Sequence, residues 1–174
     1  MGQVWGDFDV FALLLAVDEQ RTARDTSWAQ LTREIAWMSQ ATIARMREGG
    51  TARCHHVLPL IQWVGRTPES FTVGAEDFEG ELLPDPGAGR WRWYWNIPEL
   101  AAALDSQRME RELTWPQVAA EIGSGPNEIK QLQRTRYGTT ISFAMRAARW
   151  LERPAASFMW EHDGRGLPWS GRRV

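Results

Sequence analysis

The stretch that decides the fold is Trp115-Pro-Gln-Val-Ala-Ala-Glu-Ile-Gly-Ser-Gly-Pro-Asn-Glu-Ile-Lys-Gln-Leu132, in the second half of a 174-residue chain. Apolar residues recur at helical spacing on both sides of Gly123. These residues are Val118, Ile122, Ile129 and Leu132. Glycine permits the left-handed backbone of a tight turn, and proline at position 126 suits the first turn of a helix. The stretch therefore predicts two short helices joined by a turn.

The same pattern occurs once more, 87 positions earlier. Trp28-Ala-Gln30 aligns with Trp115-Pro-Gln117, and Glu34-Ile35 with Glu121-Ile122. The identities extend outward in both directions and include Asp18, Gln20, Arg21, Arg24, Trp63, Arg66, Ser70 and Phe71, each matched 87 residues later. Between Ala36 and Cys54 the register slips by one residue and then recovers. Identities spread over so long a span indicate a duplication, which we call copy one and copy two.

Each copy reads as a string of five helices, so the sequence predicts a mainly α fold. Asp9, Ser27, Asn96 and Thr114 are suitable N-caps for the first and second helices. In copy one we expect helices from residue 10, over 28–36 and 40–47, around 57–64 and near 68–71. In copy two we expect them from residue 97, over 115–122 and 126–134, around 143–151 and near 154–160.

The segment between the copies has a different composition. Residues 75–86 are acidic and lead into a Pro/Gly-rich turn, and Arg90-Trp-Arg-Trp-Tyr-Trp95 then alternates like a strand. With Phe78–Leu83 as the partner strand, the pattern predicts a β-hairpin whose tryptophan row must be buried against a domain or a partner. The expected organisation is domain one over 1–74, linker and hairpin over 75–95, domain two over 96–162, and a flexible basic tail over 163–174.

Each copy resembles the Cro/λ-repressor (XRE-type) helix-turn-helix family. Copy two matches its turn glycine and the apolar positions that lock the two helices together. Copy one, from Trp28 to Met46, has Ala36 in place of that glycine and one extra residue before Ser39. The resemblance covers about residues 10–72 and 97–160. It implies two tandem DNA-binding domains in which the third helix enters the major groove.

The resemblance also implies which residues contact DNA. In copy one they are Ser27, Gln40, Ala41, Thr42, Arg45 and Arg47; in copy two they are Thr114, Pro126, Asn127, Lys130, Gln131, Arg134 and Arg136. Gln and Asn bond adenine, Arg and Lys bond guanine, and an alanine methyl packs on thymine. Ser27 and Thr114, at the start of the second helix, are expected to offer backbone amides to phosphate. Either copy could instead have lost DNA binding and serve as a packing module.

These observations predict a sequence-specific, double-stranded-DNA-binding transcriptional regulator. We expect a repressor in which each copy is one DNA-reading domain, which we call a head. The alternative is a protein-interaction module, antitoxin-like or an accessory factor, which the acidic first half favours. A protein partner or a homodimer stays open. No pattern supports catalysis, so we expect no enzyme, no cofactor and no small-molecule ligand. Cys54-His55-His56 lacks a second Cys/His pair at zinc spacing, and the start of a helix explains it better than a metal site.

The bulk composition is consistent with this prediction. The net charge is −2, nearly all basic residues are arginine, and there is one cysteine. Arginine binds phosphate and guanine through two nitrogens at once, although a GC-rich genome also favours arginine. A single cysteine suits a reducing compartment, the N-terminus lacks a signal-peptide pattern, and no apolar run could span a membrane. The expected location is the cytoplasm.

Overall fold

The structure, a computed structural model, describes residues 6–35, 38–49, 52–74, 78–83, 92–134 and 139–162. The fold is mainly α, as predicted. Copy one contains α1 (Val10–Ala23), α2 (Trp28–Glu34), α3 (Gln40–Arg47), α4 (Cys54–Val64) and the 3₁₀ turn η1 (Pro68–Phe71). Copy two contains β1 (Arg92–Trp95), α5 (Ile97–Glu110), α6 (Trp115–Ile122), α7 (Pro126–Arg134), α8 (Ile141–Trp150), the 3₁₀ turn η2 (Ala155–Phe158) and β2 (Met159–His162).

The predicted caps begin the helices. The Asp9 carboxylate accepts a hydrogen bond from the Ala12 amide at 2.9 Å, and the Asn96 side-chain oxygen accepts one from the Glu99 amide at 3.2 Å. Ser27 caps α2 in the same way. Such caps satisfy amides that the first helical turn leaves without a partner. The starts of α1, α2 and α5 are therefore determined by local sequence.

The strand prediction was wrong in its partner. β1 pairs antiparallel with β2, so that Trp95 lies opposite Met159, and the structure describes no strand over residues 78–83. Copy one has a shorter version of the same feature, an antiparallel bridge between Phe8 and Thr72. These positions are 87 residues before Trp95 and Met159. The strand is therefore part of the repeat, joining its beginning to its end, and is not half of a linker hairpin.

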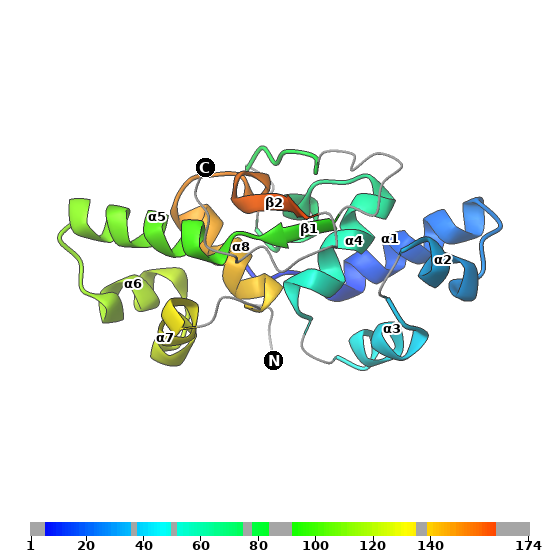
Figure 1. The fold of residues 1–174 in the computed structure, drawn as a ribbon, viewed down its shortest axis with the longest axis horizontal. Helices are drawn as coiled ribbons and strands as arrows, with labels where there is room; N and C mark the ends of the chain where they lie inside the picture. Colours follow the sequence, from blue (N-terminus) through cyan, green and yellow to red (C-terminus); the bar gives the residue numbers. More distant parts are fainter. Residues whose placement is uncertain are drawn as a thin grey trace.

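The two copies lie side by side, with α1–α3 on one side, α5–α7 on the other, and α4 and α8 between them (Figure 1). The buried residues of both copies form one continuous hydrophobic cluster, and among them Leu58, Phe143 and Phe158 have no exposed surface. Trp95, the described member of the predicted tryptophan row, is also buried, at 6% exposure. The copies therefore share a core, because apolar surface on α4 and α8 is removed from water at their junction.

The backbones of the two copies meet in a short antiparallel contact that joins Arg53 to Thr140. On one side of it the Cys54 amide donates to the Thr139 carbonyl at 3.5 Å. On the other side the Ile141 amide donates to the Ala52 carbonyl at 3.3 Å. We call residues 52–54 with 139–141 the join.

A buried carboxyl group of copy one also accepts a hydrogen bond from the backbone of copy two. Glu69 is 5% exposed, and its Oε1 accepts a hydrogen bond from the Ala155 amide at 2.7 Å. Burial raises the pKa of Glu69 above its usual value. Its equivalent in copy two is Ala156, so this link has no counterpart in the other direction.

Candidate nucleic-acid interface

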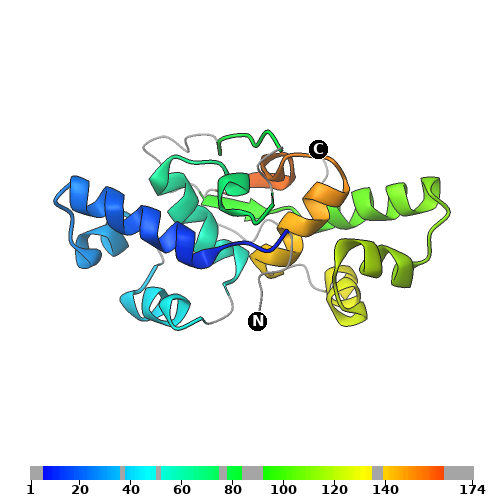
Figure 2. The same ribbon diagram turned by 180° about the vertical axis from the view of Figure 1, so that it is seen from behind.

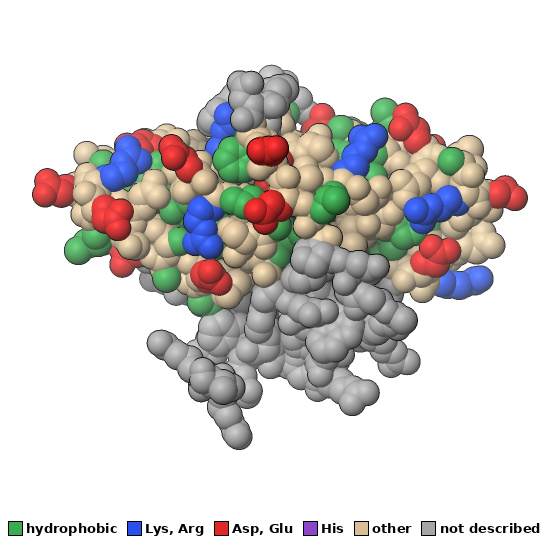
Figure 3. Space-filling view, turned by 90° about the horizontal axis from the view of Figure 1, so that it is seen from above, with side chains coloured by type: hydrophobic (Ala, Val, Ile, Leu, Met, Phe, Trp, Pro, Cys, Tyr) green, Lys and Arg blue, Asp and Glu red, His purple; other side chains and the backbone are tan. Residues whose placement is uncertain are grey.

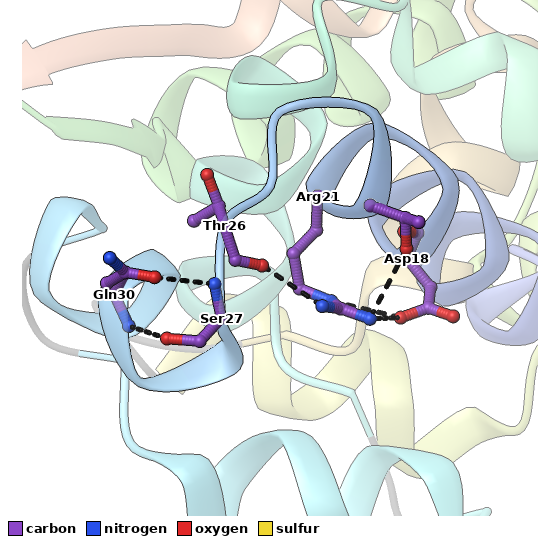
Figure 4. Close-up of polar contacts among 6 residues, drawn as sticks. Asp18, Arg21, Thr26, Ser27 and Gln30 are labelled. Atoms are coloured by element: carbon purple, nitrogen blue, oxygen red, sulfur yellow. Dashed lines mark hydrogen bonds and ion pairs between the residues drawn. The ribbon is translucent and has the colours of Figure 1, made fainter.

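The α1–α2 corner fixes the start of the second helix in copy one (Figure 4). Arg21 donates to the Asp18 carboxylate through Nε at 3.0 Å and to the Thr26 carbonyl through Nη1 at 3.0 Å. Ser27 and Gln30 then exchange hydrogen bonds as a capping box, with the Ser27 amide donating to Gln30 Oε1 at 2.7 Å. The corner is thus held by charged and capping groups that α1 and α2 supply themselves.

Copy two repeats this corner closely. Arg108 donates through Nε to Asp105 at 2.9 Å and through Nη1 to the Leu113 carbonyl at 3.0 Å. The Thr114 amide donates to Gln117 Oε1 at 2.8 Å. The amides of Ser27 and Thr114 are therefore already bonded within the protein, which differs from the expectation that these amides contact phosphate.

In copy two, α6 and α7 are joined as the sequence predicts. Gly123 ends α6 in the left-handed region with φ 70°, and the Ser124 amide donates to the Ala119 carbonyl at 2.8 Å. The four apolar residues expected to hold the helix pair together, Val118, Ile122, Ile129 and Leu132, are all 5% exposed or less. The corresponding turn residues Ala36 and Trp37 of copy one lie outside the described residues.

The third helix of copy one has a buried and an exposed face. Ile43 and Met46 are both 3% exposed, whereas Gln40, Ala41 and Arg45 are exposed. Thr42 differs from expectation, because it is 8% exposed and its hydroxyl bonds that of Ser39 at 2.9 Å. Thr42 therefore belongs to the start of the helix and is directed away from the outer surface.

Arg47 stands beside the second helix. It is exposed, and its guanidinium lies 4.3 Å from the centre of the Trp28 ring. A hollow of about 480 Å³ adjoins this pair and is lined by Trp28, Gln40, Ala41, Ile43, Ala44, Arg47 and Glu48. The structure thus gathers three of the predicted DNA-contacting residues, Gln40, Ala41 and Arg47, around one surface depression.

In copy two the third helix also exposes its expected residues. Pro126, Asn127, Lys130 and Gln131 are exposed on α7. Arg134 is the last residue of α7, but its side chain, and all of Arg136, lie outside the described parts of the chain.

The sequence alone did not show where Glu128 points. Its Oε2 accepts a hydrogen bond from the Gly125 amide at 3.2 Å and lies 3.7 Å from Nη2 of Arg146 on α8. These contacts cap α7 and turn the carboxylate toward a cation of the same protein. The spacing between Gly125 and Glu128, a residue reaching back to the start of its helix, was the signal that could have predicted this role.

The Cys54-His55-His56 segment begins α4, as expected from the sequence. Cys54 is buried, and burial raises the pKa of its thiol far above the usual range. Burial lowers the pKa of His56, and the positive charges of Arg45 and Arg53 lower it further. Within the described ranges, no group of three His, Cys, Asp or Glu residues could hold a metal ion.

The two third helices lie on the same side of the molecule. α3 and α7 both occupy its lower edge in Figure 1, on opposite sides of α4 and α8, and the view from behind in Figure 2 shows the same placement. The face seen from above in Figure 3 is the opposite one. On its described part, acidic and basic side chains are interspersed and neither sign forms a broad patch.

Among the described helices, none is both long and apolar enough to cross a membrane. Comparison with known proteins finds no family model that matches the chain, and no similar curated protein or solved structure. The geometry of the chain itself must therefore support any assignment of function.

Proposed function

We propose that the chain is a sequence-specific, double-stranded-DNA-binding transcriptional repressor of the cytoplasm, built from two tandem λ-repressor-like helix-turn-helix domains. The observation that carries the proposal is the placement of α3 and α7 on one side of the molecule, each with a buried anchor and an exposed outer face. A helix placed in this way can enter a major groove, and two of them on one side can contact one duplex.

The exposed side chains suit base recognition. Gln40 on α3 and Asn127 and Gln131 on α7 can bond adenine through both its N6 and N7, while Arg45 and Lys130 can bond guanine. Arg47, stacked on Trp28, is available to a backbone phosphate at the edge of the same surface. Both third helices therefore carry chemistry that reads sequence.

The position of Glu128 supports DNA binding by copy two. An acid on a recognition helix would repel phosphate if it faced outward, but this carboxylate bonds the Gly125 amide and lies near Arg146. Lys130, which is exposed on the same helix, offers a positive charge to the duplex. A reading role for copy two is consistent with this arrangement.

Selection from a random double-stranded DNA library, followed by binding measured over a range of salt concentrations, tests the proposal. We expect a discrete consensus and a linear fall of log affinity with log salt, since bound phosphates release counterions. Arg45→Ala and Gln131→Ala should each cost about 1–3 kcal/mol of binding free energy at different base pairs. Arg66→Ala, an exposed arginine outside both third helices, is the matched control. No consensus at low salt would overturn the proposal.

One observation favours the alternative, a protein-interaction module. Phe11 and Leu15, one turn apart on α1, are 60% and 61% exposed, which is unusual for large apolar side chains in the described part of the fold. Their equivalents in copy two are Pro98 and Ala102. If this function is the correct one, Phe11→Ser with Leu15→Ser abolishes partner binding while Arg45→Ala has no effect. DNA binding predicts the opposite pattern.

A further inference from the structure

The join has the geometry of a two-fold axis. A pseudo-two-fold that exchanges the copies pairs each backbone contact at the join with its reciprocal, in which both residues are replaced by their equivalents 87 positions away. Cys54 donates to Thr139, and the equivalents Ile141 and Ala52 form the reciprocal bond, at 3.5 and 3.3 Å. Between them Arg53 bridges Thr140, its own equivalent, in antiparallel orientation. Pairing of a position with itself is the signature of an isologous contact.

The packing on both sides of the join is reciprocal at the level of whole segments. β1 of copy two packs against α4 of copy one. Reciprocally, the segment before α1 packs against α8, because the Phe8 amide donates to Ser142 Oγ at 3.2 Å and Asp7 forms an ion pair with Arg146. Each copy thus places its N-terminal segment on the fourth helix of the other. With a shared core, these contacts hold the two heads in one orientation instead of leaving them on a flexible tether.

A two-fold between the two DNA-reading copies determines the relative orientation of the two half-sites. The two strands of DNA are themselves related by two-fold axes perpendicular to the duplex, so heads related by a two-fold read opposite strands in opposite directions. Heads repeated by translation would read the same strand twice. The join excludes the second arrangement, since it would not pair Arg53 with its own equivalent.

Building on the proposed function, we propose that one chain, as a monomer, binds an imperfect inverted repeat whose two half-sites differ. The half-sites differ because α3 presents Gln40, Ala41 and Arg45, whereas α7 presents Asn127, Lys130 and Gln131. Their centres lie about one helical turn apart, roughly 10 bp. A homodimer of identical heads would read two equal halves, whereas this chain binds in one defined direction.

The test uses synthetic duplexes that carry both selected half-sites, with the second half either as selected or inverted in place so that a direct repeat results. Additional duplexes separate the halves by 5 bp or carry one half alone. We expect inversion and the 5-bp insertion to lower affinity about 100-fold, to the level of one half-site, since linkage of two heads contributes about 10²–10⁴ in affinity. Native mass spectrometry should show one chain per duplex.

Two results would overturn the inference while leaving the proposed function intact. The first is equal affinity for the inverted and direct arrangements. The second is two chains on each duplex at saturation, which would assign the symmetry to a homodimer. Failure to select any consensus would instead count against the proposed function itself. Binding of Arg45→Ala and Gln131→Ala to duplexes that carry one half-site alone shows which copy reads which half. If both variants lose affinity for the same half-site, the inference is also contradicted.

Discussion

The framework of the two copies and their exposed third helices have diverged to very different extents. In the framework, Gln20 Nε2 donates to the Trp63 carbonyl at 2.7 Å, and Gln107 Nε2 donates to the Trp150 carbonyl at 3.0 Å. The indoles of these tryptophans donate to glutamates of the second helices at 3.0 and 2.8 Å. Arginines stack on the same rings, at 4.7 and 5.1 Å. Each of these contacts is made twice.

The outer faces of α3 and α7 share almost nothing. Aligned on Ile43 and Ile129, the one identity in their buried anchors, Arg45 corresponds to Gln131 and Ala44 to Lys130. The comparison shows which interactions hold the helices in place and which are free to change. The contacts that join the first, second and fourth helices of each copy are thus the same in both copies, whereas the exposed residues of the third helices differ.

The largest expected effect is the loss of stability when the buried isoleucine of either third helix is shortened. Ile43→Ala and Ile129→Ala each remove a side chain that is 3% exposed and anchors a third helix. Each should lower the free energy of unfolding by about 2–5 kcal/mol, because a cavity remains where the side chain packed. Urea denaturation measures the loss. A loss below about 1 kcal/mol in only one copy would show that its third helix is not anchored as described.

A smaller and equal effect is expected for the repeated tryptophans. Trp63→Phe and Trp150→Phe keep an aromatic ring beneath the arginine but remove the indole N–H that bonds Glu34 or Glu121. Since these bonds are near the surface, we expect about 1 kcal/mol for each. Glu34→Gln, which retains an oxygen acceptor, should cost less than Trp63→Phe. Clearly unequal losses would show that the two frameworks are not equivalent.

Glu128 tests whether the exposed face of α7 can approach DNA. Glu128→Gln keeps an oxygen that can accept from the Gly125 amide but removes the negative charge. Because that charge lies toward Arg146, DNA affinity should change by less than about threefold, well under 1 kcal/mol. An increase of tenfold or more would mean that the carboxylate faces the duplex and that copy two reads DNA poorly. Gln131→Glu is the matched comparison, since it adds a charge on the exposed face and should weaken binding strongly.

The smallest expected effect is on the pH dependence of stability and comes from His56. Only copy one has this histidine, since its equivalent in copy two is Phe143. Its lowered pKa means that the unfolded chain binds a proton more readily than the folded protein, so stability falls as pH falls below about 6.5. His56→Gln should therefore lose less stability than the wild type between pH 7.5 and pH 5.5. Urea unfolding at both pH values measures the difference. An identical loss in both proteins would contradict the assignment.

The helices and their caps could be predicted because they depend on local sequence. Asp9, Ser27, Asn96 and Thr114 act within three residues of themselves, and the buried positions around Gly123 follow helical spacing. The pairing of β1 could not be predicted, since alternation shows that a strand forms but does not identify a partner more than sixty residues away. The repeat aligns Trp95 with Phe8 at the start of copy one, which indicates that the strand belongs to copy two and not to the linker.

The contacts of the join could not be predicted from the sequence either. One antiparallel bridge and two hydrogen bonds have no periodic pattern, and backbone atoms leave no signature in side-chain identity. Gln40, Arg45, Lys130 and Gln131 are exposed, as contact with DNA would require. The burial of Thr42, and the contacts of the partly exposed Glu128 with Gly125 and Arg146, were missed, because both residues bond groups at the start of their own helix.

A hydroxyl-radical footprint of the intact chain on its selected site tests whether both copies read DNA. We expect two protected windows on one face of the duplex, about 10 bp apart. Arg45→Ala should weaken one window first and Gln131→Ala the other. A single window that persists at saturating protein would contradict the claim and identify one copy as a packing module.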